Sequence, residues 1–185
     1  MPTVVRRHAR TCSVRCRVAL HRARRREAAE QIPAELRKRD RWVRRSPRKV
    51  PLRVDGRGAA ASTDPSTWSS YEAAARSKVG VGLGFVLNGD GVVCLDLDHC
   101  IDERGQVAAW AQRILDACPP TFVEVSPSGR GLHIWGRGSL RGGRVIRDGE
   151  VRVEAYATGR YIAMGRRVEG APLVLGDLDG VLSVL

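Results

Sequence analysis

From residue 79 onward the chain consists of short apolar segments separated by glycine-rich turns. Residues 81–87 and 92–97 are two such segments, and Asn88-Gly89-Asp90-Gly91 between them is typical of a β-hairpin turn. Further strands are predicted at 121–126, 132–135, 151–156 and 161–164, with one helical pattern at 106–117. Because these strands follow one another without regular crossover helices, the sequence predicts an α+β domain with a largely antiparallel sheet.

The part of the chain before residue 79 has weaker signals. Residues 14–30 have a helical pattern, and Pro33 is expected in the first turn of another helix. Residues 44–66 are rich in turn signals and are expected to be irregular. Ser66 is expected to cap a short helix over 67–77, with Glu72 near its start, where the helix dipole favours an acidic side chain. Residues 174–185 can complete the sheet.

Length and composition restrict the class of protein. A chain of 185 residues, 43% of them hydrophobic, is enough for one domain of ordinary size. It contains no apolar run near the roughly 18 residues of a membrane span, and its start lacks the apolar region of a signal peptide. The five cysteines do not suggest a disulfide scaffold, so we expect a cytoplasmic protein with reduced thiols, Cys94, Cys100 and Cys118 lying in the core.

Charge is distributed very unevenly along the chain. Residues 1–50 hold 17 Lys and Arg against four Asp and Glu, whereas the remaining 135 residues hold 15 against 16. Such a block favours a polyanionic partner, and nucleic acid rather than a membrane surface because no apolar helix face accompanies it. A solvated tail is the alternative. We therefore divide the chain into a basic arm, 1–31, and a domain, 32–185.

Strand alternation places polar groups on one side of several predicted strands. Val93, Leu95 and Leu97 face one side, so that Asp96 and Asp98 face the other. Carboxylates two positions apart repel each other, a cost that a bound cation removes, and hard oxygen ligands suit Mg²⁺ or Mn²⁺. The alternative is a solvated pair on a half-exposed strand.

Two more strands repeat this pattern. In 151–156 the valines share one face and Glu154 lies on the other, and in 131–135 His133 opposes Leu132 and Ile134. The loop 126–131 leads directly to His133, and its small residues would let backbone N–H groups approach an anion. By itself such a loop is more often a plain hairpin, but next to His133 and an acidic strand it favours phosphate binding.

Three motifs together resemble a known family. They are Asp96-Leu97-Asp98, Ser126-Pro127-Ser128-Gly129-Arg130-Gly131-Leu132-His133 and Val153-Glu154-Ala155-Tyr156, which are similar to the catalytic motifs of primase-polymerases of phages, plasmids and integrated elements. These enzymes belong to the archaeo-eukaryotic primase superfamily. The flanks match in order over about residues 32–168: Ile32-Pro33 to Trp42-Val43, Lys49-Val50-Pro51, 62–68, Gly82-Leu83-Gly84-Phe85 and Gly159-Arg160-Tyr161.

The resemblance implies a fold and a set of site residues. The fold would be a small αβ module packed on a sheet like that of an RNA-recognition motif, preceded by the basic helical arm. Asp96, Asp98 and Glu154 would hold two divalent metals, Mg²⁺ or Mn²⁺, and His133 would contact the phosphates of the incoming nucleotide. The resemblance also places Ser128, Gly129 and Arg130 at the triphosphate, and Arg160 and Lys49 near the nucleotide or template.

Two features depart from the family pattern. Family members often continue into a helical segment and a helicase, so we expect a stand-alone catalytic module, a partner of a separate helicase or a truncated remnant. Cys12 and Cys16 resemble the second half of a zinc ribbon, but no upstream C-x-x-C pair is present in this sequence. His8 and His21 have a spacing that matches no known site well, so we do not expect zinc at Cys12 and Cys16.

The implied function is therefore a nucleotidyltransferase, a primase or DNA polymerase that uses nucleoside triphosphates on a DNA template during replication of a mobile element. Two alternatives stay open. One is a non-catalytic DNA-binding remnant, and the other is a metal-dependent nuclease that uses the same carboxylates. The sequence gives no oligomeric state and no preference between ribo- and deoxyribonucleotides.

Overall fold

The structure is a computed structural model that describes residues 15–16, 18–19 and 31–185. The predicted helix 14–30 and Cys12 therefore fall wholly or largely outside the described residues. The chain divides into two units, Met1–Ile32 and Pro33–Leu185, and the fold below is that of the second unit. In the described part of the chain no helix is both long and apolar enough to cross a bilayer.

The second unit is a mixed α+β structure, which confirms the predicted class. Its elements are α2 (Ala34–Arg37), β1 (Trp42–Arg45), β2 (Pro51–Leu52), the 3-10 helix η1 (Pro65–Thr67), α3 (Tyr71–Arg76), β3 (Gly82–Asn88), β4 (Val92–Leu97), α4 (Ala109–Ala117), β5 (Phe122–Val125), β6 (Leu132–Arg137), β7 (Arg144–Asp148), β8 (Val151–Tyr156), β9 (Thr158–Ala163), β10 (Arg166–Arg167), β11 (Gly176–Asp177) and α5 (Asp179–Val184).

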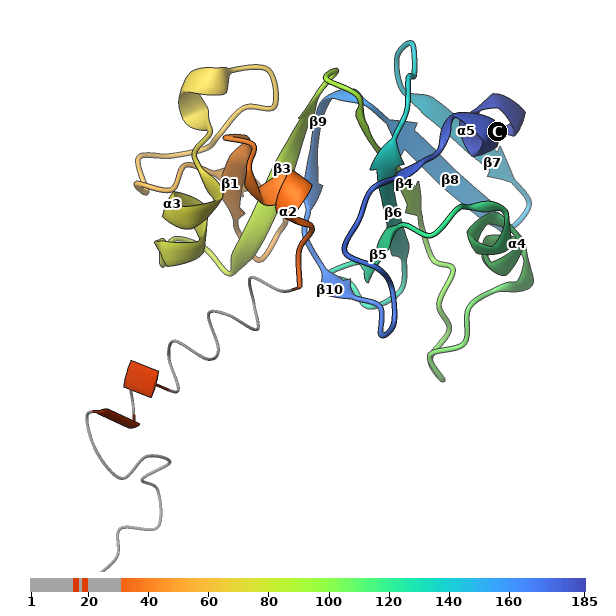
Figure 1. The fold of residues 1–185 in the computed structure, drawn as a ribbon, viewed down its shortest axis with the longest axis horizontal. Helices are drawn as coiled ribbons and strands as arrows, with labels where there is room; N and C mark the ends of the chain where they lie inside the picture. Colours follow the sequence, from red (N-terminus) through yellow and green to blue (C-terminus); the bar gives the residue numbers. More distant parts are fainter. Residues whose placement is uncertain (1–14, 17, 20–30) are drawn as a thin grey trace, which may run out of the picture. The chain divides into compact units, whose positions relative to one another are not determined.

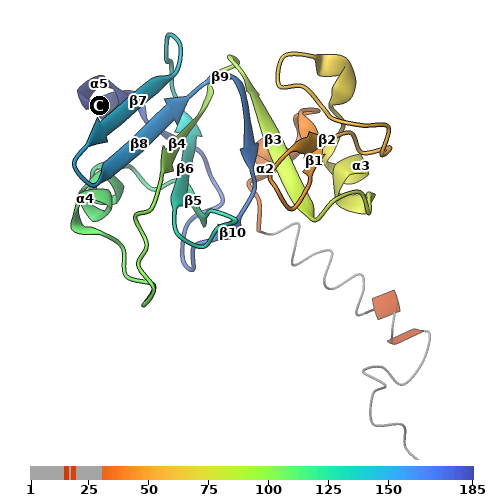
Figure 2. The ribbon, with the colours of Figure 1, turned by 180° about the vertical axis from the view of Figure 1, so that it is seen from behind.

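The strands form two sheets, which Figures 1 and 2 show from opposite sides. The smaller sheet has the order β2-β1-β3-β9, and the larger has the order β10-β5-β6-β4-β8-β7, with β11 added on β6. Neighbouring strands are antiparallel except for β11 and β6, which are parallel. The largely antiparallel arrangement predicted from the sequence is therefore confirmed.

The expected hairpin at residues 88–91 is wrong. β3 pairs with β1 and β9 in the smaller sheet, whereas β4 pairs with β6 and β8 in the larger one. The chain continues forward through Gly89 and Gly91, both with positive φ, and passes from one sheet to the other. The return path runs through β8 and β9, which Ala157 alone separates, and Gly89 N donates to Ala157 O at 2.8 Å. Two antiparallel strands thus pass together from sheet to sheet.

The N-terminal half of the domain differs from prediction in two places. Residues 44–66 are not wholly irregular, because β1 and β2 pair around a tight turn at Ser46–Lys49. The helix expected over 67–77 begins later. Asp64 caps η1 by accepting from Ser66 N at 3.0 Å, and Ser70 caps α3 by accepting from Ala73 N at 3.2 Å. Ser66 is therefore not the cap.

The main core lies on one face of the larger sheet. Leu95, Leu97, Leu132, Ile134 and Val153 point there and pack with side chains of α4 and α5, which Figure 1 shows on this side. The other face carries the polar residues of the same strands. Part of that face is covered by the smaller sheet, where the Trp135 ring meets the Phe85 ring edge-on at 5.8 Å between centroids. The polar residues of the candidate site lie on the same face of the larger sheet.

Candidate active site

The polar residues predicted on separate strands stand in one row across the larger sheet. The strand register places His133 of β6 opposite Asp96 of β4, and Asp96 opposite Glu154 of β8. The row continues to β5, where Glu124 is opposite His133. Because cross-strand neighbours lie about 5 Å apart, their side chains meet on one face.

The carboxylates of Asp96, Asp98 and Glu154 form a half-buried cluster. One oxygen from each lies within 4.8 Å of the others. Burial raises the pKa of Asp96, and the charges of Asp98 and Glu154 raise it further against the opposing effect of His133. Asp96 Oδ1 is buried, and within the described part of the chain it has no hydrogen-bond partner. An unsatisfied oxygen among three acidic groups fits a hard divalent cation, so the residues present are suited to Mg²⁺ or Mn²⁺.

His133 is held between two acidic side chains. Its Nδ1 lies 2.8 Å from Oε1 of Glu124 and its Nε2 lies 3.6 Å from Oδ1 of Asp96. Because an ionised carboxylate only accepts, Nδ1 donates to Glu124, which leaves Nε2 on the side of the carboxylate cluster. Trp135 Nε1 donates to the same Glu124 oxygen at 3.2 Å. Burial lowers the pKa of His133, but the hydrogen bond and charge of Glu124 and the charge of Asp96 outweigh this and raise it.

A pocket of about 350 Å³ adjoins this row, and we call it the inter-sheet pocket. Asp96 and His133 line it from the larger sheet, and Lys49, Arg160 and Tyr161 line it from the smaller one. Tyr161 Oη is buried without a hydrogen-bond partner among the described residues, as Asp96 Oδ1 is. The Tyr161 hydroxyl is a free donor beside the cationic Lys49 and Arg160, and this side of the pocket therefore suits an anionic ligand, whereas Asp96 Oδ1 needs a cation or a donor.

Lys49 reaches this pocket from a strained position. It closes the turn between β1 and β2 with φ of 60°, a left-handed conformation in which glycine is usual. The turn is fixed by Lys49 N donating to Ser46 O at 3.0 Å and Val50 N donating to Ser46 Oγ at 3.0 Å. A long cationic side chain at a position that favours glycine points to a use for the ammonium group in the pocket.

Glu154 is positioned by two side chains, Tyr156 and Arg160, that contact its Oε2 atom. Tyr156 Oη donates to Glu154 Oε2 at 2.5 Å, and Arg160 Nη2 lies 3.5 Å from the same oxygen. The Arg160 guanidinium also stacks over the Tyr156 ring, 4.4 Å from its centroid. Burial, followed by the hydrogen bond to Glu154, raises the pKa of Tyr156 to about 12, so the phenol stays protonated as a donor.

The predicted residues Ser128, Gly129 and Arg130 do not line the inter-sheet pocket. They form the exposed turn between β5 and β6, in which Gly129 has φ of 76° and Arg130 N donates to Ser128 Oγ at 3.3 Å. This turn lies at the same end of the strands as Asp98, because Leu97 and Leu132 are register partners. The structure thus brings together Asp96, Asp98, Glu154, His133, Lys49 and Arg160, and it leaves the turn at the edge of this group.

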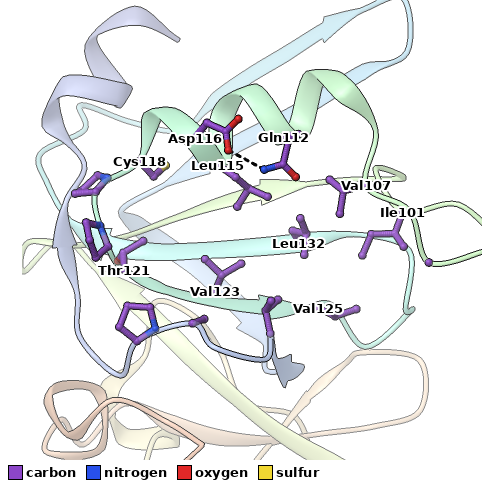
Figure 3. Close-up of a pocket in the computed structure, with 16 residues that line it drawn as sticks. Ile101, Val107, Gln112, Leu115, Asp116, Cys118, Thr121, Val123, Val125 and Leu132 are labelled. Atoms are coloured by element: carbon purple, nitrogen blue, oxygen red, sulfur yellow. Dashed lines mark hydrogen bonds between the residues drawn. The ribbon is translucent and has the colours of Figure 1, made fainter.

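A wider, apolar pocket of about 670 Å³ lies on the opposite face of the larger sheet, beside α4 (Figure 3). Val123, Val125 and Leu132 line it from the strands, and they alternate with Glu124 and His133. Asp96, Asp98 and Glu154 do not line it, so we do not place the chemistry there.

Two residues of the site escaped the sequence analysis. Glu124 is 1% exposed, and its signal was a lone glutamate in the apolar strand Phe122-Val123-Glu124-Val125. Tyr161 stood in a segment that resembles the family, but the sequence assigned it no role in the site. Its ring lies so close over Gly84 that a Cβ at that position would come within 1.9 Å of it, which explains the glycine in β3.

Comparison with known proteins supports the resemblance found in the motifs. No family model matches the chain. The chain is 34% identical over 153 residues to a protein of Nitratiruptor phage NrS-1 described as a DNA primase-polymerase, and the match covers 78% of this chain. It spans 21%, about a fifth, of the length of the phage protein. At this level of identity over most of this chain, the match supports a primase-polymerase domain.

Proposed function

We propose that this domain is a nucleotidyltransferase that synthesises a DNA or RNA strand on a template by a two-metal mechanism. The observation that carries the proposal is the position of three converging carboxylates beside a pocket lined by Lys49, His133 and Arg160. Acidic groups that can hold divalent cations, next to cationic groups that can hold phosphates, are what phosphoryl transfer requires. The similarity to a DNA primase-polymerase favours nucleotide polymerisation over other phosphoryl transfers.

We also propose how the two sheets correspond to the parts of the family fold. We infer that the larger sheet corresponds to the sheet that resembles an RNA-recognition motif, and that the smaller sheet with α2 and α3 corresponds to the small αβ module. Residues 32–185 would then be the catalytic domain, and the basic arm 1–31 would bind nucleic acid. Replication of a phage, plasmid or integrated element is the proposed context, and a separately encoded helicase stays a predicted partner.

Each side chain has a role in this mechanism. Asp96, Asp98 and Glu154 would hold the cations, which when bound would lower the pKa of the attacking hydroxyl and stabilise the leaving pyrophosphate. His133 would donate from Nε2 to the triphosphate in the inter-sheet pocket, together with Lys49 and Arg160. The turn Ser128-Gly129-Arg130 would contact the part of the triphosphate that extends past His133.

The reaction balances without any further reactant. The 3′-oxygen of a strand or of an initiating nucleotide bonds to the α-phosphorus of the incoming nucleotide. The bond from that phosphorus to the β-phosphate oxygen breaks, and pyrophosphate leaves. The hydroxyl proton passes to solvent. Orienting the two reactants is therefore the main task of the protein side chains.

Strand synthesis is tested by incubating the protein with Mn²⁺, a primed or unprimed DNA template and labelled nucleotides. The proposal predicts products longer than the primer, or new short strands, and their loss in the Asp98→Asn variant. Shortened DNA would instead identify a metal-dependent nuclease. Unchanged DNA, with binding retained, would identify a non-catalytic DNA-binding domain.

A further inference from the structure

A second pocket adjoins the carboxylates on the side away from the inter-sheet pocket. It has a volume of about 260 Å³ and is lined by Asp98, His99, Arg147, Arg152 and Glu154, with Ile146 and Val153. We call it the β7–β8 pocket. The roles given above use Asp98 and Glu154 but leave both arginines unexplained.

These arginines oppose each other directly. Arg147 of β7 and Arg152 of β8 are register partners, and two like charges in this position destabilise a sheet. Both side chains lie on the same face of the sheet as Glu154. Arg152 is two residues before Glu154 on β8, and Arg147 is two residues after Val145, the register partner of Glu154 on β7. Arg147 Nη2 lies 3.4 Å from Glu154 Oε1, so Arg147 is in direct contact with the carboxylate cluster.

The two arginines differ in their contacts and in their exposure. Arg152 Nη1 donates to Gly149 O at 2.9 Å and to Val151 O at 3.1 Å, which holds its guanidinium beside the β7–β8 turn. The Arg147 side chain is 67% exposed. One guanidinium held by the turn and one exposed guanidinium, both at the edge of the carboxylate cluster, are suited to a phosphate group, since each offers a fork of N–H donors that matches two phosphate oxygens.

The strand order separates the phosphate-binding groups into two sets. The carboxylates stand on β4 and β8, His133 and the Ser128–Arg130 turn stand beside them at β6, and Arg147 stands on the opposite side at β7. Joining two nucleotides requires two phosphate-bearing reactants, one on each side of the metal site. The β6 side has the groups proposed to hold the incoming triphosphate, and this leaves the β7 side for the other reactant.

We propose, on the basis of the proposed function, that Arg147 and Arg152 bind the phosphate of the reactant that supplies the attacking 3′-hydroxyl. That phosphate is the last phosphodiester of a primer or the triphosphate of an initiating nucleotide. Held there, the reactant presents its 3′-oxygen to the carboxylate cluster between the two pockets. The charge repulsion between the arginines is relieved when the phosphate is bound.

The test uses Arg147→Gln and Arg152→Gln, with Arg113→Gln on the exposed surface of α4 as the matched control. In extension of a recessed-end primer on its template, each site variant should raise KM for the primer about 10- to 100-fold, because one charge-assisted hydrogen bond to the phosphate is removed. KM for the incoming nucleotide should change less than about twofold, since its phosphates lie on the β6 side. Arg113→Gln should change neither. A rise in nucleotide KM with primer KM unchanged would overturn the proposal.

A second assay distinguishes the two sources of the phosphate. On a template without primer, a site that holds the initiating triphosphate predicts a higher KM for the first nucleotide in both site variants. A defect confined to primer extension identifies the phosphodiester as the ligand, and one confined to unprimed synthesis identifies the triphosphate. Wild-type kinetics in both assays would contradict the assignment.

Binding measurements keep this inference separate from the proposed function. Fluorescence anisotropy with a recessed-end duplex, without nucleotide, should show weaker binding by both site variants than by Arg113→Gln. This comparison can be made even if the wild type synthesises no strand. The proposed function would then fail, and DNA binding by the variants would still test the phosphate site. Retention of the Mn²⁺-induced rise in Tm in each variant shows that the carboxylate cluster is intact. Equal binding by all three variants of both the recessed-end duplex and a nucleoside triphosphate would refute the site.

Discussion

His133 donates from Nδ1 to Glu124 Oε1 across 2.8 Å, and both side chains are almost completely buried, 4% and 1% exposed. The arrangement gives the two ring nitrogens different tasks. Nδ1 satisfies a buried carboxylate, whereas Nε2 lies on the side of the inter-sheet pocket. His133 is therefore both part of the fold and a proposed ligand of the triphosphate, so replacing it by alanine would disturb both and would not separate them.

Changing Glu124 separates the two tasks. In Glu124→Gln the side-chain oxygen still accepts from His133 and Trp135, but the negative charge that raises the pKa of His133 is absent. We expect a folded protein whose nucleotide affinity at neutral pH is about tenfold weaker and recovers as the pH is lowered and His133 becomes protonated. Glu124→Leu should in addition lose about 1–3 kcal/mol of stability for each donor left unsatisfied. Nucleotide titrations over a pH series measure both effects, and a pH-independent affinity in Glu124→Gln would contradict this role.

Replacing Lys49 by glycine should move stability and binding in opposite directions. Glycine relieves the left-handed strain at φ of 60°, worth about 1 kcal/mol, and should raise Tm by about 2–4 °C. Removing the ammonium group from the inter-sheet pocket should weaken nucleotide binding roughly tenfold or more. Arg48→Ala, in the same turn but outside the pocket, is the control. If Lys49→Gly binds nucleotide as tightly as the wild type, Lys49 does not contact the triphosphate.

The pKa of Asp96 predicts how the metal-free protein responds to pH. Burial raises this pKa, so the folded state binds the proton more tightly than the unfolded state does, for which the ordinary value is 3.8. Stability is therefore lost as the pH rises from that value through the raised pKa. In EDTA, Asp96→Asn should melt above the wild type at neutral pH, and the difference should shrink as the solution is acidified. Asp116→Asn on α4 should show no such trend, and an Asp96→Asn variant less stable than the wild type at every pH would contradict the account.

The basic arm predicts a salt-dependent contribution to DNA binding. Residues 1–31 carry nine Lys and Arg against two Glu. Deleting them should weaken DNA binding, and the slope of log affinity against log salt should become shallower by about 0.9 for each DNA phosphate that the arm neutralises. Nucleotide affinity should stay the same, which serves as the internal control. Equal salt slopes for the full-length and truncated proteins would show that the arm does not bind DNA.

Strand alternation allowed the direction of the carboxylates to be predicted from the sequence. The valines and leucines around Asp96 and Glu154 face a core, so the carboxylates had to face the other way, and the structure brings them together. Alternation also placed Asp98 beside Asp96, and the family resemblance added Lys49 and Arg160 to the same region. These inferences need only local pattern or a matching motif, and neither depends on how the sheets are joined.

Other features depend on interactions between distant segments. The turn signals at Asn88–Gly91 do not tell whether the chain reverses or continues, and here it continues into a second sheet. Residues 144–148, which form β7, lie among glycines and charged residues and were not predicted as a strand. The pairing of Arg147 with Arg152 could therefore not be predicted. Glu124 was missed because a lone glutamate acquires its meaning only from His133 on the neighbouring strand.

The most direct test of the account is the change in Tm on adding Mn²⁺. Asp96, Asp98 and Glu154 converge within 4.8 Å, and a cation that binds only the folded state should stabilise it. At about one hundred times its Kd, Mn²⁺ should raise the Tm of the wild type by about 5–10 °C, and Asp96→Asn, Asp98→Asn or Glu154→Gln should abolish the rise. A wild type that shows no shift with Mn²⁺, or three variants that shift as it does, would contradict the metal site and the polymerase mechanism that depends on it.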